Sequence, residues 1–202
     1  MKKEEEKEIL ENWKLPKKKY AVIVVDPPWR YDNKRLGDEK HKGNVPYPDM
    51  SLNEIAKIPI SDLSKNDCIL WLWTTNAFMH EAFHLIENWG FTQKTILTWK
   101  KNRMGLGNWL RGKTEHCILA IKGKPYIKLT NQTTIIEGKV REHSRKPEEF
   151  YQLVGSLCVG TCLDIFAREE REGWDTFGNE KRKFNRDKYK FAGTIKEKRK
   201  QQ

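Results

Sequence analysis

A short turn, Asp26-Pro27-Pro28-Trp29, directly follows the apolar run 21–25 of this 202-residue chain. Proline fixes the backbone φ angle and has no N–H, so the turn lacks two hydrogen-bond donors. The carbonyls of Asp26 and Pro27 are therefore expected to point outwards without a local donor. A carboxylate beside a free carbonyl is a rigid double acceptor, and its natural guest is an amino group, which carries two donors.

The indole of Trp29 offers a face on which a planar ring can stack. A planar ring with an amino group is adenine or cytosine, so the stretch 21–29 predicts a base-binding site. The structural alternative is a plain proline turn beside a core tryptophan, and for the Pro-Pro dipeptide alone that alternative is favoured. The whole stretch after a buried strand favours the site. A carboxylate at position 26 that faces the interior, pairs with a lysine and is closed off from any cleft would refute this interpretation.

A second pattern, His80-Glu81-Ala-Phe-His84, fits the H-E-x-x-H helix of zinc proteases. On a helix the two histidines share a face and could hold zinc, with Glu81 as the base. Such a site needs a third protein ligand, and residues 88–114 contain no Asp, Glu or His. The sequence therefore disfavours the protease and predicts no metal site.

The elements that must position these residues alternate between apolar strands and amphipathic helices. Strands are expected at 20–25, 68–74, 93–101, 116–123, 133–140, 162–169 and 174–180. Helices are expected at 1–12, 51–58, 76–90 and 146–158, with a long loop at 30–50. Because the strands are apolar on both faces, they predict an α/β sheet, mostly parallel, with helices on both faces.

Ligands of such sheets bind outside the carboxyl ends of the strands. The polar residues that fall at or near the expected strand ends are Asp26, Thr74, Lys100, Asp164 and Asn179. No glycine-rich fingerprint follows the first strand, which counts against an ordinary dinucleotide-binding enzyme.

The chain is strongly basic, with a formal net charge of +11. Residues 181–202 hold ten Lys or Arg against two acidic residues. Nucleic acid is the usual partner of such a surface, and an acidic membrane is the main competitor. No apolar run reaches the roughly 18 residues of a membrane-spanning helix, and the N-terminus has no signal-peptide core. We therefore expect a soluble protein of the cytoplasm, or one associated with the nucleoid (with the nucleus in a eukaryote), with its four cysteines reduced.

The order of several sequence blocks resembles the MT-A70 family of N6-adenine methyltransferases. The blocks are DPPW (26–29), VPYPDMSLNEI (45–55), LWLWTT (70–75), GNWLRGKTEHCILAIKGKP (107–125), HSRKPEEFY (143–151) and CLDIFARE…GWDTFGNE (162–180). The resemblance implies a Rossmann-like methyltransferase fold, circularly permuted, that transfers a methyl group from S-adenosyl-L-methionine to adenine N6. It divides the chain into a charged extension (1–19), a methyltransferase domain (20–180) and a basic tail (181–202).

The resemblance also implies a role for individual residues. Asp26 and Pro27 would accept the two N6 hydrogens and aim the nitrogen lone pair at the methyl donor. The predicted catalytic residues are Asp26, Pro27, Pro28 and Trp29. The predicted cofactor contacts are Asp26, Lys146, Asp164, Phe166, Arg168, Asn179 and Glu180. The substrate contacts expected from the resemblance and from the basic loop 101–113 are Trp29, Tyr47, Lys101, Arg103, Trp109, Arg111, Lys113 and Glu115.

Two alternatives to a DNA enzyme stay open: an RNA N6-adenosine methyltransferase, and a catalytically silent subunit that binds nucleic acid. The small chain favours DNA, because the large RNA enzymes of the family carry extra domains and a partner subunit. The intact turn and cofactor residues favour activity. A second copy of the chain stays open as a partner, and no membrane is expected.

Overall fold

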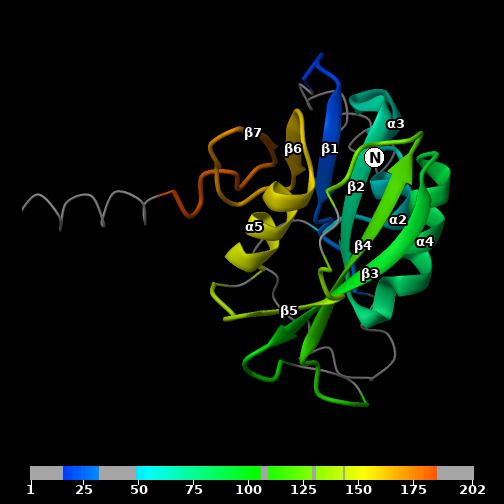
Figure 1. Cartoon of the computed structure of the whole chain (residues 1–202). Helices are drawn as coiled ribbons and strands as arrows, with labels where there is room; N and C mark the ends of the chain where they lie inside the picture. The colour runs from blue at the N-terminus through cyan, green and yellow to red at the C-terminus, as the bar shows by residue number, and fades with distance from the viewer. Residues whose placement is uncertain (1–15, 32–48, 106–108, 129–130, 143, 186–202) are drawn as a thin grey trace, which may run out of the picture.

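A computed structural model gives the fold of residues 16–31, 49–105, 109–128, 131–142 and 144–185 (Figure 1). Its centre is a mixed sheet of seven strands in the order β5-β3-β4-β2-β1-β6-β7. The strands are β1 (Tyr20–Val25), β2 (Ser64–Thr74), β3 (Thr92–Lys101), β4 (Thr114–Lys122), β5 (Ile135–Gly138), β6 (Cys162–Ile165) and β7 (Trp174–Phe177). Every neighbouring pair is parallel except those of β4, which runs antiparallel to β2 and β3.

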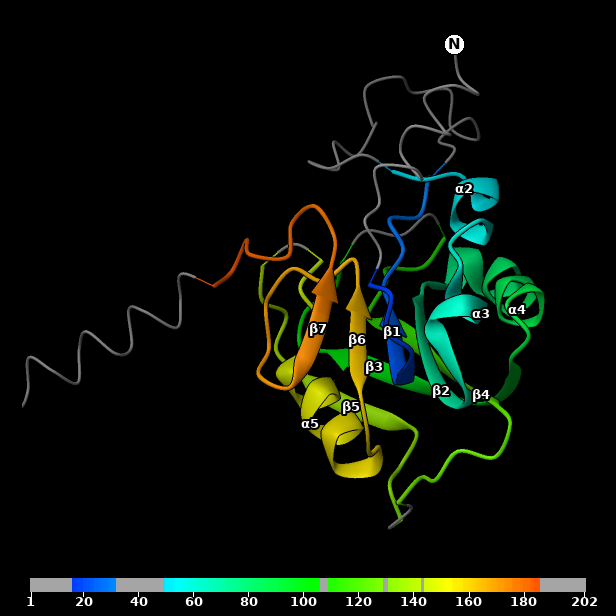
Figure 2. The ribbon, with the colours of Figure 1, turned by 90° about the horizontal axis from the view of Figure 1, so that it is seen from above.

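Helices cover both faces of the sheet, as the apolar strands predict. One face carries α2 (Leu52–Ala56), α3 (Ile60–Leu63) and α4 (Met79–Asn88), the last preceded by the 3₁₀ turn η3 (Asn76–Phe78). The other face carries α5 (Glu148–Leu157), and Figure 2 shows it on the opposite side of the sheet from α2, α3 and α4. Side chains along β1 alternate between the two faces of the sheet. Ile23 and Val25 pack in the hydrophobic core on the side of α2, α3 and α4, and Val22 and Val24 pack in the core on the side of α5.

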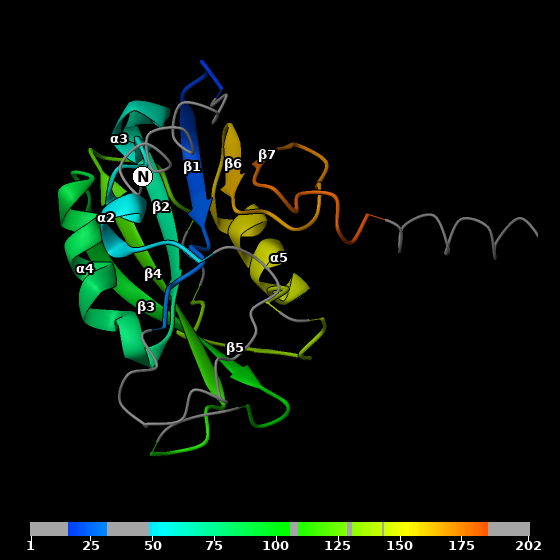
Figure 3. The same ribbon diagram turned by 180° about the vertical axis from the view of Figure 1, so that it is seen from behind.

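The strand order places a topological switch point beside β1, which lies between β2 and β6 (Figure 3). The chain leaves β1 towards β2 and later returns to β6 on the other side. Loops after such a pair of parallel strands diverge and leave a crevice at their carboxyl ends, where α/β proteins bind ligands. Asp26 directly follows β1 and Phe166 directly follows β6, so the fold brings both to this crevice.

Most expected elements are confirmed, with differences at their ends. The capping box predicted at the start of α2 is present, with Ser51 Oγ accepting from the Glu54 N–H and Glu54 accepting from the Ser51 N–H. Strand β2 begins at Ser64 rather than 68, because residues 64–67 are polar, with 65–67 exposed, and give no apolar signal. The four-residue helix α3 is an addition to the sequence prediction.

Parts of the predictions lie outside the described residues, namely the N-terminal helix, Tyr47 and most of the loop 30–50, and the tail beyond residue 185. All four cysteines are free thiols, as expected. Among the described residues, no helix is long and apolar enough to cross a lipid bilayer.

Candidate active site

The turn after β1 holds its carbonyls differently from the prediction. The Trp29 N–H donates to the Pro27 carbonyl at 2.9 Å, and the Met50 N–H donates to the Pro28 carbonyl at 2.8 Å. The first bond closes a three-residue turn around Pro28, whose fixed φ angle suits that turn. The expectation that the Pro27 carbonyl lacks a local donor is therefore wrong. A carbonyl oxygen has two lone pairs, so this oxygen keeps the capacity for a second donor.

The carboxylate of Asp26 is paired with a lysine from the start of α5. Lys146 Nζ lies 2.7 Å from Asp26 Oδ2 and 3.3 Å from Glu115 Oε2. Glu115, the second residue of β4, also pairs with Lys101 at the end of β3. Four charged side chains from four parts of the chain thus meet at the edge of the sheet where the parallel strands end. Glu115 reaches this edge because β4 runs antiparallel to its neighbours and begins there.

Burial and charge pull the pKa values of this cluster in opposite directions. Burial raises the pKa of Asp26, and the Lys146 ammonium opposes that rise. Burial also raises the pKa of Glu115, but the two lysines outweigh it and leave the pKa below its ordinary value. For Lys146, burial lowers the pKa and the two carboxylates outweigh it, so the pKa lies above its usual range. Lys146 is therefore a permanent cation that two carboxylates share.

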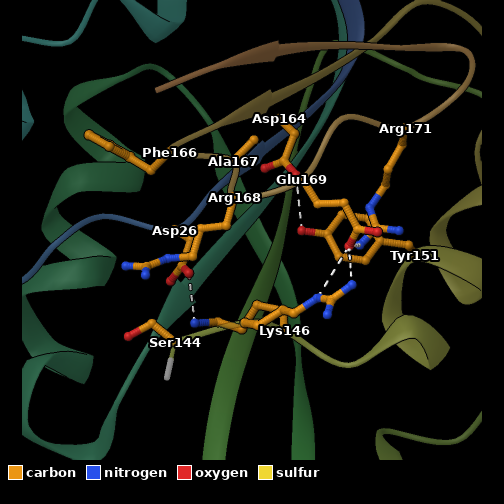
Figure 4. Close-up of a pocket in the computed structure, with 11 residues that line it drawn as sticks. Asp26, Ser144, Lys146, Tyr151, Asp164, Phe166, Ala167, Arg168, Glu169 and Arg171 are labelled. Carbon is orange, nitrogen blue, oxygen red and sulfur yellow. Dashed lines mark hydrogen bonds and ion pairs between the residues drawn. The ribbon is translucent and has the colours of Figure 1, made fainter. Parts of the chain in front are cut away.

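The lysine pairing meets one of the three conditions that together would refute a base-binding role for Asp26. Another of them, closure from any cleft, is not met. The Asp26 side chain is 19% exposed, and it lines a pocket together with residues that follow β6 (Figure 4). The pocket lies at the switch point between β1 and β6, so the position of Asp26 remains compatible with ligand binding.

Asp164 occupies the inner wall of this pocket, where it is only 2% exposed. Tyr151 of α5 donates its hydroxyl to Asp164 Oδ2 at 2.9 Å, and the Arg171 guanidinium lies 3.6 Å above the centre of the Tyr151 ring. Burial raises the pKa of Asp164 to about 7, against the hydrogen bond from Tyr151 and the charge of Arg171, which lower it. The group therefore changes protonation near neutral pH.

Arginine and glutamate side chains support the pocket from behind. Glu169, 7% exposed, accepts hydrogen bonds from Arg145 at 2.9 Å and from Arg171 at 3.1 Å. Arg171 also pairs with Glu148 of α5 at 2.7 Å. These pairs tie the segment after β6 to the start of α5, and they fix two walls of the pocket relative to each other.

The corner after β6 has an unusual backbone. Phe166 has a φ of +66°, which is uncommon for a residue with a side chain. Gly178 lies against it, and a Cβ at Gly178 would come within 3.0 Å of the Phe166 Cα. Such backbone outliers concentrate at ligand sites, and this one holds Phe166 and Ala167 on the pocket wall.

The other predicted cofactor residues lie around this corner. Arg168 lines the pocket and pairs with Glu180 at 2.8 Å. Asn179 is exposed in the turn after β7. The structure thus gathers Asp26, Lys146, Asp164, Phe166 and Arg168 in one pocket, with Glu180 on its border.

Trp29 lies in the core rather than at the surface. Its side chain packs in the same core as α2 to α4, and the residue is 8% exposed. One ring face stacks on Phe78 with centroids 5.1 Å apart, and Nε1 donates to the Trp73 carbonyl at 3.2 Å. The expected open face is therefore absent from this arrangement. The alternative of a core tryptophan beside a proline turn accounts for the position of the Trp29 ring, and base stacking by Trp29 stays a prediction.

The predicted substrate loop divides into a buried root and an exposed end. Lys101 belongs to the root, because its ammonium pairs with Glu115 and its side chain is 18% exposed. It is placed to hold Glu115, not to face a phosphate. Arg103, Arg111, Lys113 and Trp109 are exposed in the β3–β4 connection, where nucleic acid could reach them.

The histidine pair of α4 lies away from this pocket. His84 Nε2 and His80 Nε2 are 3.1 Å apart, and both side chains are exposed. Among the residues that the structure describes, no three His, Cys, Asp or Glu side chains gather as a metal site. The protease arrangement therefore gains no support from the fold.

Several pocket residues were not predicted from the sequence. They are Ser144, Arg145, Tyr151, Glu169 and Arg171. Each lies within or next to the blocks 143–151 and 162–180 that carry the family resemblance. Membership of these blocks was the one feature of the sequence that could have marked them as pocket residues. Residue type alone could not select them, because charged residues near a helix start are usually solvated.

Comparison with known proteins agrees with the fold. The MT-A70 family profile matches residues 20–180. The type II methyltransferase M.MunI from Mycoplasma sp is 31% identical over 187 residues, which is 82% of this chain and 79% of M.MunI. The N(6)-adenosine-methyltransferase MT-A70-like protein of Arabidopsis thaliana is 30% identical over 80% of this chain. The human catalytic subunit METTL3 is 29% identical over 80% of it. The chain spans about a quarter of these two longer relatives, 24% and 28%.

Proposed function

The chain belongs to the MT-A70 family of N6-adenine methyltransferases, and on that premise we propose that it methylates the N6 amino group of adenine in DNA. The observation that carries the proposal is the position of Asp26. Its carboxylate ends the strand at the switch point of the sheet, is 19% exposed and lines a pocket with residues of both signs of charge.

Methyltransferases of this family use S-adenosylmethionine as methyl donor, and the pocket fits the charges of that molecule. Its amino-acid end carries an ammonium and a carboxylate, and its ribose carries hydroxyls. The pocket lining offers Asp26 and Asp164 for cationic groups, and Lys146 and Arg168 for an anionic group. We assign Asn179 and Glu180 to the ribose, and Phe166 to apolar contact. When bound, S-adenosylmethionine supplies an electrophilic methyl group.

The acceptor side of the pocket is suited to an amino group. One N6 hydrogen would be accepted by the Asp26 carboxylate and the other by the free lone pair of the Pro27 carbonyl. Two such bonds orient the nitrogen lone pair, which the adenine ring otherwise withdraws. Lys146 holds the carboxylate in place at 2.7 Å, and once positive charge has developed on N6, one N6 proton would pass to the Asp26 carboxylate that accepts its hydrogen bond.

The preference for DNA is supported by the lengths over which the relatives match. The chain matches most of the length of a type II methyltransferase, but only about a quarter of the length of the adenosine methyltransferases. RNA is the competing substrate, and the names of the longer relatives favour it.

The decisive experiment uses labelled S-adenosylmethionine with matched DNA and RNA, each single- and double-stranded. We expect label in DNA, with N6-methyladenine as the product in a nuclease digest. Label in RNA alone would refute the DNA proposal, and label in neither would favour the catalytically silent subunit.

The matched variant is Asp26→Asn, which keeps the shape of the side chain. Its one remaining acceptor, the amide oxygen, is also the partner that the Lys146 ammonium requires, so the amide NH2 is left facing N6 and we expect transfer to fall at least 100-fold. Cofactor affinity, measured by calorimetry, should change less than transfer. A D26N protein that methylates at the wild-type rate would show that this carboxylate has no part in the reaction.

A further inference from the structure

The connection between β3 and β4 carries the two most exposed large apolar side chains of the described residues. Trp109 is 97% exposed and Leu110 86%, and Met104 on the other arm is 65% exposed. Several large apolar side chains exposed on one short connection mark a candidate binding surface, whereas single ones need no explanation. We call Met104, Trp109 and Leu110 the hairpin tip.

The hairpin is anchored to the catalytic edge of the sheet. The Lys101 N–H donates to the Lys113 carbonyl at 2.9 Å, and the Gly105 N–H donates to the Gly112 carbonyl at 2.7 Å. At the root, Lys101 pairs with Glu115, whose other oxygen contacts the lysine that holds Asp26. The connection extends beyond the lower end of the sheet in Figure 1. Its tip therefore projects from the same edge that holds the pocket.

The charge beside the tip favours a polyanion as its partner. Arg103, Arg111 and Lys113 are exposed next to it, and residues 88–114 contain neither Asp nor Glu. Basic residues interleaved with an exposed aromatic ring are typical of nucleic-acid contacts, in which cations meet phosphates and rings stack on bases. An apolar protein partner would gain nothing from these charges.

We propose that the hairpin tip is a wedge that enters a DNA duplex and fills the space left by the target adenine. This inference rests on the proposed function and adds how a paired base reaches Asp26. Inside a duplex, N6 is engaged in base pairing, so the base must leave the stack before it can enter the pocket. Leucine and methionine side chains serve as wedges between base steps, and a tryptophan ring replaces the lost stacking.

The length of the hairpin agrees with this role. The four residues from Lys101 to Gly105 span up to about 13 Å, at about 3.3 Å per residue of extended chain. The grooves of B-DNA are only about 7.5–8.5 Å deep. The tip can therefore reach the base stack while the root stays on the catalytic edge.

The first test measures binding, so that it does not depend on methyl transfer. Fluorescence anisotropy compares a perfect duplex with the same duplex carrying a mismatch, in which unstacking is already easier. The wild type should bind both with similar affinity, because the wedge compensates for unstacking. The W109A variant should bind the perfect duplex at least 5-fold more weakly than the mismatched one. Equal affinities of W109A for the two duplexes would overturn the wedge.

The second test measures methylation of one DNA sequence as duplex and as single strand. W109A should lose at least 10-fold in rate on the duplex and less than 2-fold on the single strand, and W109F should restore most of the duplex rate. An equal loss on both forms would make Trp109 a general substrate contact, and no loss would remove it from recognition. Either result overturns the proposal.

Tyr126→Ala provides the matched control. Tyr126 is also an exposed aromatic residue, at 72%, but it follows the carboxyl end of β4 at the opposite edge of the sheet. Its removal should leave both tests unchanged. A change in oligomeric state of W109A in size-exclusion chromatography, without a change in duplex binding, would assign the tip to a protein contact and overturn the wedge. If the wild type methylates no nucleic acid, the proposed function fails, and the anisotropy test still decides the wedge.

Discussion

Replacing Lys146 with methionine would reveal how much the site depends on one shared cation. Lys146 Nζ lies 2.7 Å from Asp26 and 3.3 Å from Glu115, and the lysine side chain is 8% exposed. Methionine keeps much of the length and the apolar contacts of the side chain and removes its charge. The two carboxylates then face each other, and Lys101 still neutralises part of the charge of Glu115.

The size of the effect follows from the geometry. Both carboxylate oxygens contact one nitrogen, so they lie no more than about 6 Å apart, and their repulsion is about 3 kcal/mol at an effective dielectric constant of about 20. Removal of one partner from a buried ion pair costs about 3–5 kcal/mol. We therefore expect Lys146→Met to lower the free energy of unfolding by about 3–5 kcal/mol at pH 7.5.

The loss should be smaller at low pH. Without the lysine, the pKa of Asp26 in the folded protein, which burial already raises, lies further above its value in the unfolded chain. A carboxyl of this kind binds its proton more tightly when folded, so stability falls as pH rises from about 4 towards the folded pKa. At pH 5 protonation relieves the repulsion, and the difference from the wild type should shrink.

Urea unfolding followed by tryptophan fluorescence measures this prediction at pH 5 and pH 7.5. Lys94→Met is the matched control, because Lys94 is an exposed lysine within β3, and its replacement should change the free energy by less than about 0.5 kcal/mol. A loss below about 1 kcal/mol for K146M, or the same loss at both pH values, would refute the reasoning about a shared buried cation.

Three further substitutions test other parts of the structure. Burial raises the pKa of Asp164 to about 7, so the free energy of unfolding of the wild type falls as pH rises towards 7. Asp164→Asn lacks this titration. In urea unfolding, the free energy of unfolding of the variant minus that of the wild type should therefore rise by about 3 kcal/mol between pH 5 and pH 8. Phe150→Ala should cost about 3–5 kcal/mol in the same assay, because the ring is fully buried against two tryptophans of β2. Gly178→Ala should cost about 1–3 kcal/mol and lower the thermal midpoint, since its φ is +145° and only glycine adopts that region readily.

The sequence determines the central strands well, and their ends and directions less well. The run of buried β-branched residues and the following proline predict β1 to the residue. The direction of β4 could not be read in this way, because an apolar pattern is the same in parallel and antiparallel strands. Residues 65–67 of β2 are exposed and polar, so no apolar pattern marks this part of the strand.

The candidate site was predictable in five of its lining residues (Asp26, Lys146, Asp164, Phe166 and Arg168) and not in their contacts. Asp26 and Lys146 stand out through the turn chemistry and the family blocks, yet they are 120 residues apart in the chain and their ion pair depends on the completed sheet. The burial of Trp29 could not be predicted either. A tryptophan after a proline turn looks the same in the sequence whether its ring faces solvent or, as here, stacks on Phe78.

The single antiparallel strand of the described sheet, β4, separates the charged cluster at the pocket from the exposed hairpin that precedes the strand, so that evolution could alter each independently. Its amino end delivers Glu115 to the edge where the other strands finish, and the chain that leads to it is a hairpin with its own internal bonds. On the wedge proposal, insertions or exchanges between those arms would change which nucleic acid the protein binds without altering the pocket at Asp26. Grafting the equivalent hairpin of a relative onto this scaffold is therefore a direct route to a new target preference.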